Sequence, residues 1–68
     1  MESVAKVVEI TSMSKKSFED AIAKGIARAS KTLDGITGAW IQDQKVDVKK
    51  GKIEAYRVNM KVTFILKS

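Results

Sequence analysis

Three carboxylates in the second half of the chain, Asp43, Asp47 and Glu54, are the first residues to consider for chemistry. Their oxygens, together with Glu9 and backbone carbonyls, are the kind of ligand that Ca²⁺ and Mg²⁺ prefer. The spacing of these residues does not match an EF-hand loop. Carboxylates repeated around a symmetry axis can still form a cation site that one chain does not display, so the three remain candidate metal ligands.

Catalytic side chains are scarce in this sequence. The chain contains no Cys and no His, which removes thiol nucleophiles, imidazole acids and bases, and the commonest ligands of zinc, copper and haem. Asp43 and Glu54 are a conceivable acid–base pair, but nothing around them distinguishes them from surface charges. We therefore expect a protein that is not an enzyme.

Trp40 and Arg57 are the remaining side chains with a capacity for binding. A lone Trp stacks on a planar ligand or packs at a subunit contact, where Trp is enriched, and the second alternative is favoured. Arg57 binds a phosphate or pairs with Asp43, Asp47 or Glu54 on a neighbouring strand, and pairing is favoured. Both alternatives are left open for each residue.

The chain has 13 Lys and Arg against 8 Asp and Glu, a formal net charge of +5. Such an excess favours anionic partners, but the cations are scattered and cluster only at Lys49–Lys52. Binding of single-stranded nucleic acid also needs exposed aromatic rings on a charged face, whereas Tyr56 and Phe64 fall on an apolar face. We expect a solubilising basic surface and no nucleic-acid partner.

The sequence carries no signal for export or membrane insertion. Residues 1–4 lack a basic segment followed by an apolar one, and no apolar run approaches the roughly 18 residues that span a bilayer. The absence of Cys is compatible with a reducing cytoplasm. We expect a soluble, cytoplasmic protein without a membrane partner.

The first half of the chain predicts one strand and one helix. Residues 4–10 are rich in β-branched side chains and favour a strand, with Val8 and Ile10 inward. Ser14 or Ser17 can cap a helix over residues 15–33, whose large apolar residues are spaced by three or four. Gly25 inside this helix indicates close packing, and Gly35 is suited to the left-handed C′ position at its end.

The second half predicts a β-hairpin. Residues 39–48 favour a strand, but Ile41 has the opposite parity to Val46 and Val48, so a bulge or bend is expected between them. Residues 49–52 form a tight turn with Gly51 at a positive φ. Residues 53–67 alternate between apolar and polar side chains and form the clearest strand.

Length and geometry together predict an oligomer. A single domain over residues 1–68 buries little surface, and without Cys or a common metal ligand it needs association for stability. The last strand extends about 45–50 Å, whereas the helix covers less than about 30 Å. One helix cannot cover the apolar face of that strand, so other copies of the chain must.

The order strand, Ser-rich loop, helix and long hairpin resembles the dodecin family over nearly the whole chain, without gaps. The residues that carry the resemblance are Ser17–Ile22, where the family typically has Ser-Trp-Glu-Asp-Ala-Ile; Ala27–Leu33; Gly51–Ile53; and Tyr56, Val58, Lys61, Val62 and Phe64. The resemblance implies an α+β fold of β-α-β-β order, in which a three-stranded antiparallel sheet wraps around one helix. It also implies a non-enzymatic, hollow shell of twelve copies that stores or buffers a small ligand.

The resemblance implies two alternatives for the ligand, a flavin or a divalent cation. Flavin-binding dodecins stack riboflavin or FMN on a Trp of the second strand and hydrogen-bond it to a Gln of the third. Those positions are Gly38 and Arg57 here, so the flavin site is altered. Trp40 points to the same face as Gly38 and is a displaced candidate platform, with Gln44 and Lys45 as further candidates for ligand contact.

The same departures also resemble dodecins that bind cations. The second alternative for this chain is therefore a calcium-dodecin-like shell holding a divalent cation, or a purely structural shell that binds no flavin tightly.

Overall fold

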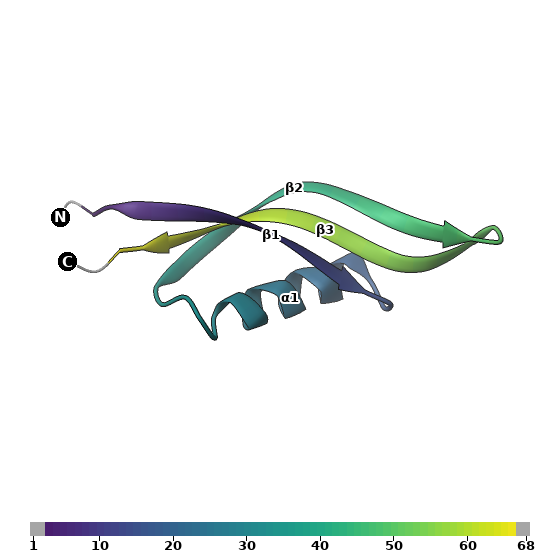
Figure 1. Cartoon of the computed structure of the whole chain (residues 1–68), viewed down its shortest axis with the longest axis horizontal. Helices are drawn as coiled ribbons and strands as arrows, with labels where there is room; N and C mark the ends of the chain where they lie inside the picture. Colours follow the sequence, from purple (N-terminus) through teal and green to yellow (C-terminus); the bar gives the residue numbers. More distant parts are fainter. Residues whose placement is uncertain (1–2, 67–68) are drawn as a thin grey trace.

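The computed structural model describes residues 3–66 and contains four elements in the order β-α-β-β (Figure 1). They are β1 (Ala5–Ser14), α1 (Phe18–Ala29), β2 (Ile36–Lys49) and β3 (Lys52–Ile65). All strand pairs are antiparallel, and β3 lies between β1 and β2. The α+β fold that the sequence predicts is confirmed.

The boundaries differ from the predicted ones by a few residues. β1 continues to Ser14 and β2 begins at Ile36, so both strands are longer than expected, whereas α1 is shorter at both ends. β3 ends at Ile65, and the predicted end at Lys67 lies outside the described residues. Apart from Met13 and Ile36, the extra strand residues are polar or small, and they join the sheet because β3 offers them a continuous pairing partner.

The core is the face of β3 that α1 covers. Val58, Met60 and Val62 alternate along the strand and are fully buried, and Phe64 is nearly so. Ile10 of β1 and Ile41 of β2 lie opposite Met60 in the register and pack against the same cluster. The strict alternation in β3 thus divides the sheet into an inner face towards α1 and an outer face away from it.

The pairing of β2 with β3 is interrupted by three register shifts. Shifts occur between Ile36 and Gly38, between Ile41 and Asp43, and between Asp47 and Val48. The second shift lies between Ile41 and Val46, which face the core at Met60 and Tyr56 although their sequence parity differs. The predicted bulge is confirmed, and it lets both apolar residues point to the inner face.

The start of α1 is fixed by two serines. Ser17 is the N-cap, and its Oγ accepts a hydrogen bond from the Asp20 backbone N at 2.9 Å. The buried Ser14 Oγ donates to Asp20 Oδ2 at 2.5 Å and accepts from the Lys16 N. This hydrogen bond and the contact with Lys24 hold the pKa of Asp20 below its ordinary value of 3.8, so the carboxylate stays ionised while it ties the loop to the helix.

The packing of α1 confirms the close approach that Gly25 predicts. The small residues Ala21, Gly25 and Ala29, spaced by four, are the buried stripe, whereas the larger Phe18 and Ile22 lie half-buried beside it. A Cβ on Gly25 would lie 2.9 Å from Met60 Cε and 3.0 Å from Ser12 Cβ. Close packing is therefore the reason for a glycine inside this helix.

The end of α1 also differs from prediction. The helix stops at Ala29, and Ser30 is the C-cap in a right-handed conformation whose Oγ donates to the Ile26 carbonyl. Gly35 does have a positive φ of 76°, but it lies in the loop before β2 and is not the C′ residue. Local hydroxyl bonds therefore end the helix earlier than the apolar periodicity suggests.

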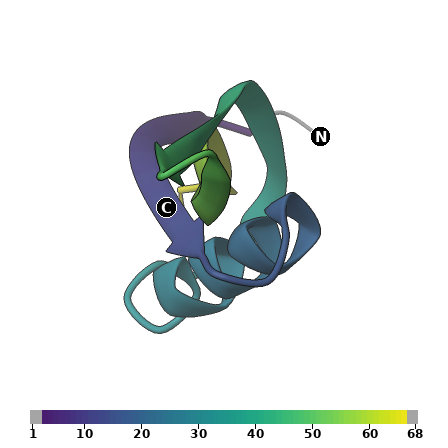
Figure 2. The same cartoon turned by 90° about the vertical axis from the view of Figure 1, so that its right-hand side faces the viewer.

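The β2–β3 hairpin closes on Lys50 and Gly51, which both have positive φ (52° and 76°). Two central residues with positive φ form the tight turn that matches strand twist, as predicted. The hairpin extends well past the N-terminal end of α1 (Figure 1). Figure 2, viewed from the hairpin side, shows the strands curving above α1. Its paired residues Val48 and Ile53 are 61% and 52% exposed, so apolar surface is left uncovered within one chain.

We predict that Gly25→Ala destabilises the protein, although Ala favours a helix interior by about 1 kcal/mol over Gly. The added methyl overlaps Met60 and Ser12, and overpacking of this kind costs about 1–3 kcal/mol. Denaturant unfolding at fixed protein concentration measures the change. In a Ser12→Gly background the same substitution should cost less, because one overlap is gone, and equal costs in both backgrounds would contradict the packing argument.

Candidate ligand site on the outer face of the sheet

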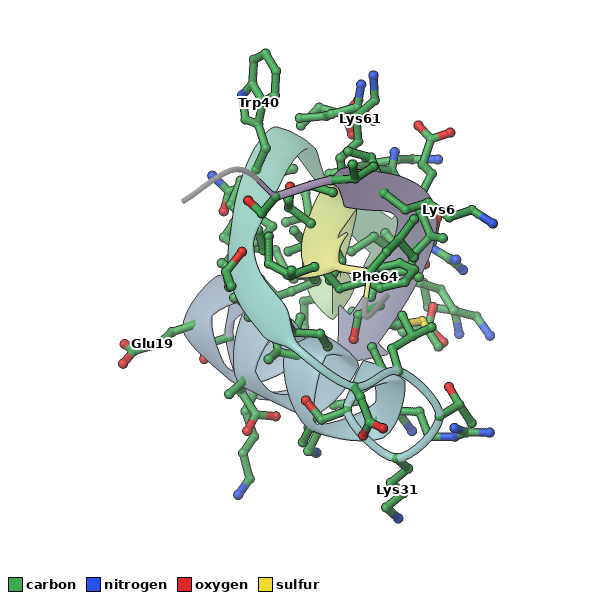
Figure 3. All side chains as sticks on the ribbon, turned by 90° about the vertical axis from the view of Figure 1, so that its left-hand side faces the viewer. Lys6, Glu19, Lys31, Trp40, Lys61 and Phe64 are labelled. Atoms are coloured by element: carbon green, nitrogen blue, oxygen red, sulfur yellow. The ribbon has the colours of Figure 1, made fainter. Side chains whose placement is uncertain are left out.

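The outer face carries cross-strand rows of polar side chains set by the register. Trp40 of β2 lies opposite Lys61 of β3, which in turn lies opposite Glu9 of β1. Figure 3 shows Trp40 and Lys61 on the side of the sheet away from α1, with Phe64 on the inner side. These rows place aromatic and charged groups side by side in reach of solvent.

Gly38 and Trp40 form an open part of this face. They lie opposite Thr63 and Lys61, two residues apart with no register shift between them, so they share a face as predicted. A Cβ on Gly38 would meet nothing within 4 Å, and its φ is not positive. Trp40 is 72% exposed, and the space above Gly38 on the same face is open. A flat molecule can therefore lie over Gly38 next to Trp40.

Arg57 is engaged within the chain. Its Nε donates to both oxygens of Asp47, at 2.9 and 3.2 Å, and both side chains are partly buried. Of the two alternatives for this residue, pairing with a carboxylate is the one present, and the partner is Asp47. Lys45 and Met13 lie opposite Arg57 in the register, so this row carries two cations, and Asp47 reaches Arg57 from the neighbouring row.

Gln44 lies apart from the other candidates. It is opposite Val58, whose side chain is buried against the inner face, whereas Trp40, Lys45 and Arg57 belong to the outer face. Residues directly opposite each other in an antiparallel pair share a face. The structure therefore brings Gly38, Trp40, Lys45 and Arg57 to one surface and does not bring Gln44 there.

The positions of Gly38 and Arg57 are also separated along the sheet. Gly38 is opposite Thr63, six residues from Arg57 on β3, which is about 20 Å at 3.3 Å per residue. A single flavin ring system cannot contact both within one chain. If both positions line one site, a second copy of the chain supplies one of them.

The candidate metal ligands do not form a cluster in one chain. Asp43 accepts a hydrogen bond from Asn59 Nδ2 at 2.7 Å, and Asn59 Oδ1 accepts one from Thr11 Oγ1 at 2.7 Å. Asp47 is held by Arg57, and Glu54 is exposed near the hairpin turn. Within residues 3–66 no three His, Cys, Asp or Glu side chains lie close enough to hold a metal ion.

Sequence reasoning missed Asn59, Thr11 and Lys61 as members of this surface. Their parity in β1 and β3 places them on the polar face, but their partners across the strands depend on the register and on the shift near Ile41. No helix among the described residues has the length and apolar character needed to cross a bilayer.

The comparisons with known proteins agree with this architecture. A dodecin from Streptomyces davaonensis has 29% sequence identity and a TM-score of 0.95, with 100% of each chain covered. A mutant of the dodecin from Thermus thermophilus has 28% identity and a TM-score of 0.93, covering 98% of this chain and 98% of that one. No curated protein matches the chain.

A calcium dodecin from Mycobacterium tuberculosis, described as calcium chelating, has 36% identity and a TM-score of 0.82, covering 96% of this chain and 93% of that one. The family model for dodecins matches residues 4–67, nearly the whole sequence. With the fold, the register and this match in agreement, the chain belongs to the dodecin family.

Proposed function

We propose that this chain forms a non-enzymatic, homododecameric shell that binds or buffers a small planar ligand on the outer face of its sheet. Dodecins are homo-oligomeric, ligand-binding shells, and members of the family bind flavins. The observation that carries the proposal is the 72% exposed ring of Trp40 beside the bare backbone of Gly38. A soluble protein retains so exposed a Trp where it is covered by a ligand or another subunit.

The assembly part of the proposal rests on uncovered apolar surface. α1 has 12 residues and spans about 18 Å, whereas β3 has 14 and spans about 46 Å. Val48 and Ile53 at one end of the sheet and Val4 and Leu66 at the other remain exposed. Burial of both ends against other copies would supply the stability that a domain of this size lacks.

Two residue differences predict that this chain binds flavin more weakly than flavin-binding dodecins do. The position that provides a stacking Trp in flavin-binding dodecins is Gly38, so stacking worth about 0.5–1.5 kcal/mol is lost there. Arg57 at the Gln position offers donors only, and it is already bound to Asp47. Flavin is therefore held weakly, and Trp40 is the ring that remains for stacking.

We expect light scattering to give a mass near twelve subunits, because the hairpin and the chain ends need partners. Ile53→Asp should shift the protein to smaller species without loss of β-sheet circular dichroism. Lys50→Asp, at the solvent-exposed turn, is the control and should assemble normally. A stable monomer of the parent at micromolar concentration would contradict the proposal.

We expect Gly38→Trp combined with Arg57→Gln to bind riboflavin at least tenfold more tightly than the parent. Restored stacking and one or two hydrogen bonds at about 0.5–1.5 kcal/mol each account for that gain. The open space at Gly38 and its ordinary backbone conformation permit the ring. Titration of riboflavin fluorescence measures the affinity.

The control for this experiment is Gly38→Leu with Arg57→Gln, which adds bulk without an aromatic face and should not reproduce the gain. Both double variants lose the ion pair with Asp47, a partly buried surface pair worth about 1 kcal/mol. An assembled Trp variant with unchanged affinity would show that these two positions do not control the site.

A cation-binding shell is the second candidate function, and one observation favours it. Asp43 is held in place by Asn59, which is itself oriented by Thr11, yet the carboxylate makes no salt bridge within the described part of the chain. An oriented carboxylate without a cation partner becomes a metal ligand when symmetry brings several copies together. The likeness to a calcium dodecin supports this alternative.

For this alternative we expect calorimetry to detect Ca²⁺ binding by the assembled protein. Asp43→Asn should weaken it by about tenfold or more, because a charged oxygen ligand is lost. Asp34→Asn, in the loop before β2, removes the same charge away from the outer face and should leave binding unchanged. Equal affinity of both variants would exclude Asp43 as a ligand.

A further inference from the structure

A groove runs between β1 and α1 on the inner side of the sheet, away from Trp40. Its volume is about 570 Å³, within the range of roughly 300–1,000 Å³ typical of small-molecule sites. Its apolar lining comes from Val8, Ile10, Gly25, Ala29 and Leu33. Because Gly25 and Ala29 lack bulky side chains, a groove remains open beside the contact between α1 and β1.

The charged side chains that line this groove are all positive. Lys24 and Arg28 line it, one helical turn apart, and no carboxylate among the described residues does. Lys24 is paired with Asp20 at 3.1 Å, whereas Arg28 has no salt bridge within residues 3–66. Arg28 is therefore a free guanidinium at the edge of an apolar trough, with a fork of donors suited to a carboxylate or phosphate.

The free edge of β1 adds one backbone N–H, together with the carbonyl of the same residue. The Leu66 N donates to the Val4 carbonyl, so in this register the even residues of β1 bond to β3 and the odd ones face the free edge. Thr11, which lines the groove, belongs to the odd set. Its backbone N–H is thus directed to the unpaired side of β1.

The carbonyl groups at the C-terminal end of α1 repel a bound anion only weakly. Carbonyl groups at a helix C-terminus carry partial negative charge, but those of Ile26, Arg28 and Ala29 accept bonds from the amides of residues 30–33. The Ser30 and Thr32 hydroxyls also donate to the Ile26 and Ala29 carbonyls. Arg28 therefore acts beside carbonyls that are already satisfied.

We propose that this groove binds a small amphiphile with an anionic head, a carboxylate or a phosphate, and an apolar tail. Arg28 holds the head, and the tail lies along Val8, Ile10 and Leu33. This site is separate from the outer-face site and does not depend on it. The exposed hairpin of a second copy is a poor occupant, since its turn carries Lys49, Lys50 and Lys52 and would meet Lys24 and Arg28.

Calorimetry with the assembled protein tests the proposal. The probes are decanoate and decyl phosphate, each below its micelle concentration, and decanol and decyltrimethylammonium are the controls. We expect one or both anionic probes to bind, and their relative affinities distinguish a carboxylate from a phosphate head. Decanol should bind at least about tenfold more weakly, because the charge-assisted hydrogen bond is lost, and the cationic probe should not bind.

Two variants locate the site. Arg28→Gln should weaken binding of the anionic probe by about tenfold or more, and Thr32→Phe should block the groove without changing its charge. Lys31→Gln is the matched control, because Lys31 points away from the sheet (Figure 3) and does not line the groove.

Three results would overturn the proposal. Neither anionic probe binds; or Arg28→Gln and Lys31→Gln behave alike, which places the ligand elsewhere; or Thr32→Phe and Arg28→Gln change the oligomeric mass while no probe binds. In the last case the groove is a contact between copies of the chain. Riboflavin affinity and the mass of the parent assembly are independent readouts, so failure here leaves the proposed function intact.

Discussion

The contact between α1 and the centre of β3 determines the rest of this structure. Gly25 lies so close to Met60 and Ser12 that a single added carbon would overlap them, and this approach draws the sheet around the helix. Because a 12-residue helix packs on a 14-residue central strand, only the middle of the strand is covered. The exposed Val48, Ile53 and Leu66 follow from that mismatch in length, and association with other copies is the economical way to bury them.

The central position of β3 also separates stability from binding. Its even residues from 58 to 64 build the core, and its odd residues from 57 to 61 present Arg57, Asn59 and Lys61 to the outer face. Side chains on opposite faces of one strand do not contact each other. Substitutions on the outer face, where we propose that the ligand binds, can therefore be made while the core, and with it the fold, is retained.

The fold was largely predictable because its signals are local. Alternation in residues 56–66, the glycine turn and the serine cap each depend on neighbours in sequence. The larger apolar residues of α1 do pack against the core, but periodicity alone does not show that the small residues beside them are the most deeply buried. The candidate site was predicted only in part. Gln44 falls on the other face, and Asn59 and Thr11 join Asp43, because the pairing depends on the exact residue at which the register shifts. The change of parity between Ile41 and Val46 predicts a bulge but does not assign it to one residue.

The separation of Gly38 from Arg57 carries the argument about ligands one step further. With about 20 Å of sheet between them, the two positions can line one ligand site, as we propose, only where copies of the chain meet. A substitution at either position is then repeated around the whole assembly, so one change alters every site at once. Identity of 29% with a TM-score of 0.95 to a dodecin fits such a division, in which a constant scaffold carries a lining that changes easily. On this view, the bare backbone at Gly38 and the Arg57–Asp47 pair are changes in the lining of an unchanged shell.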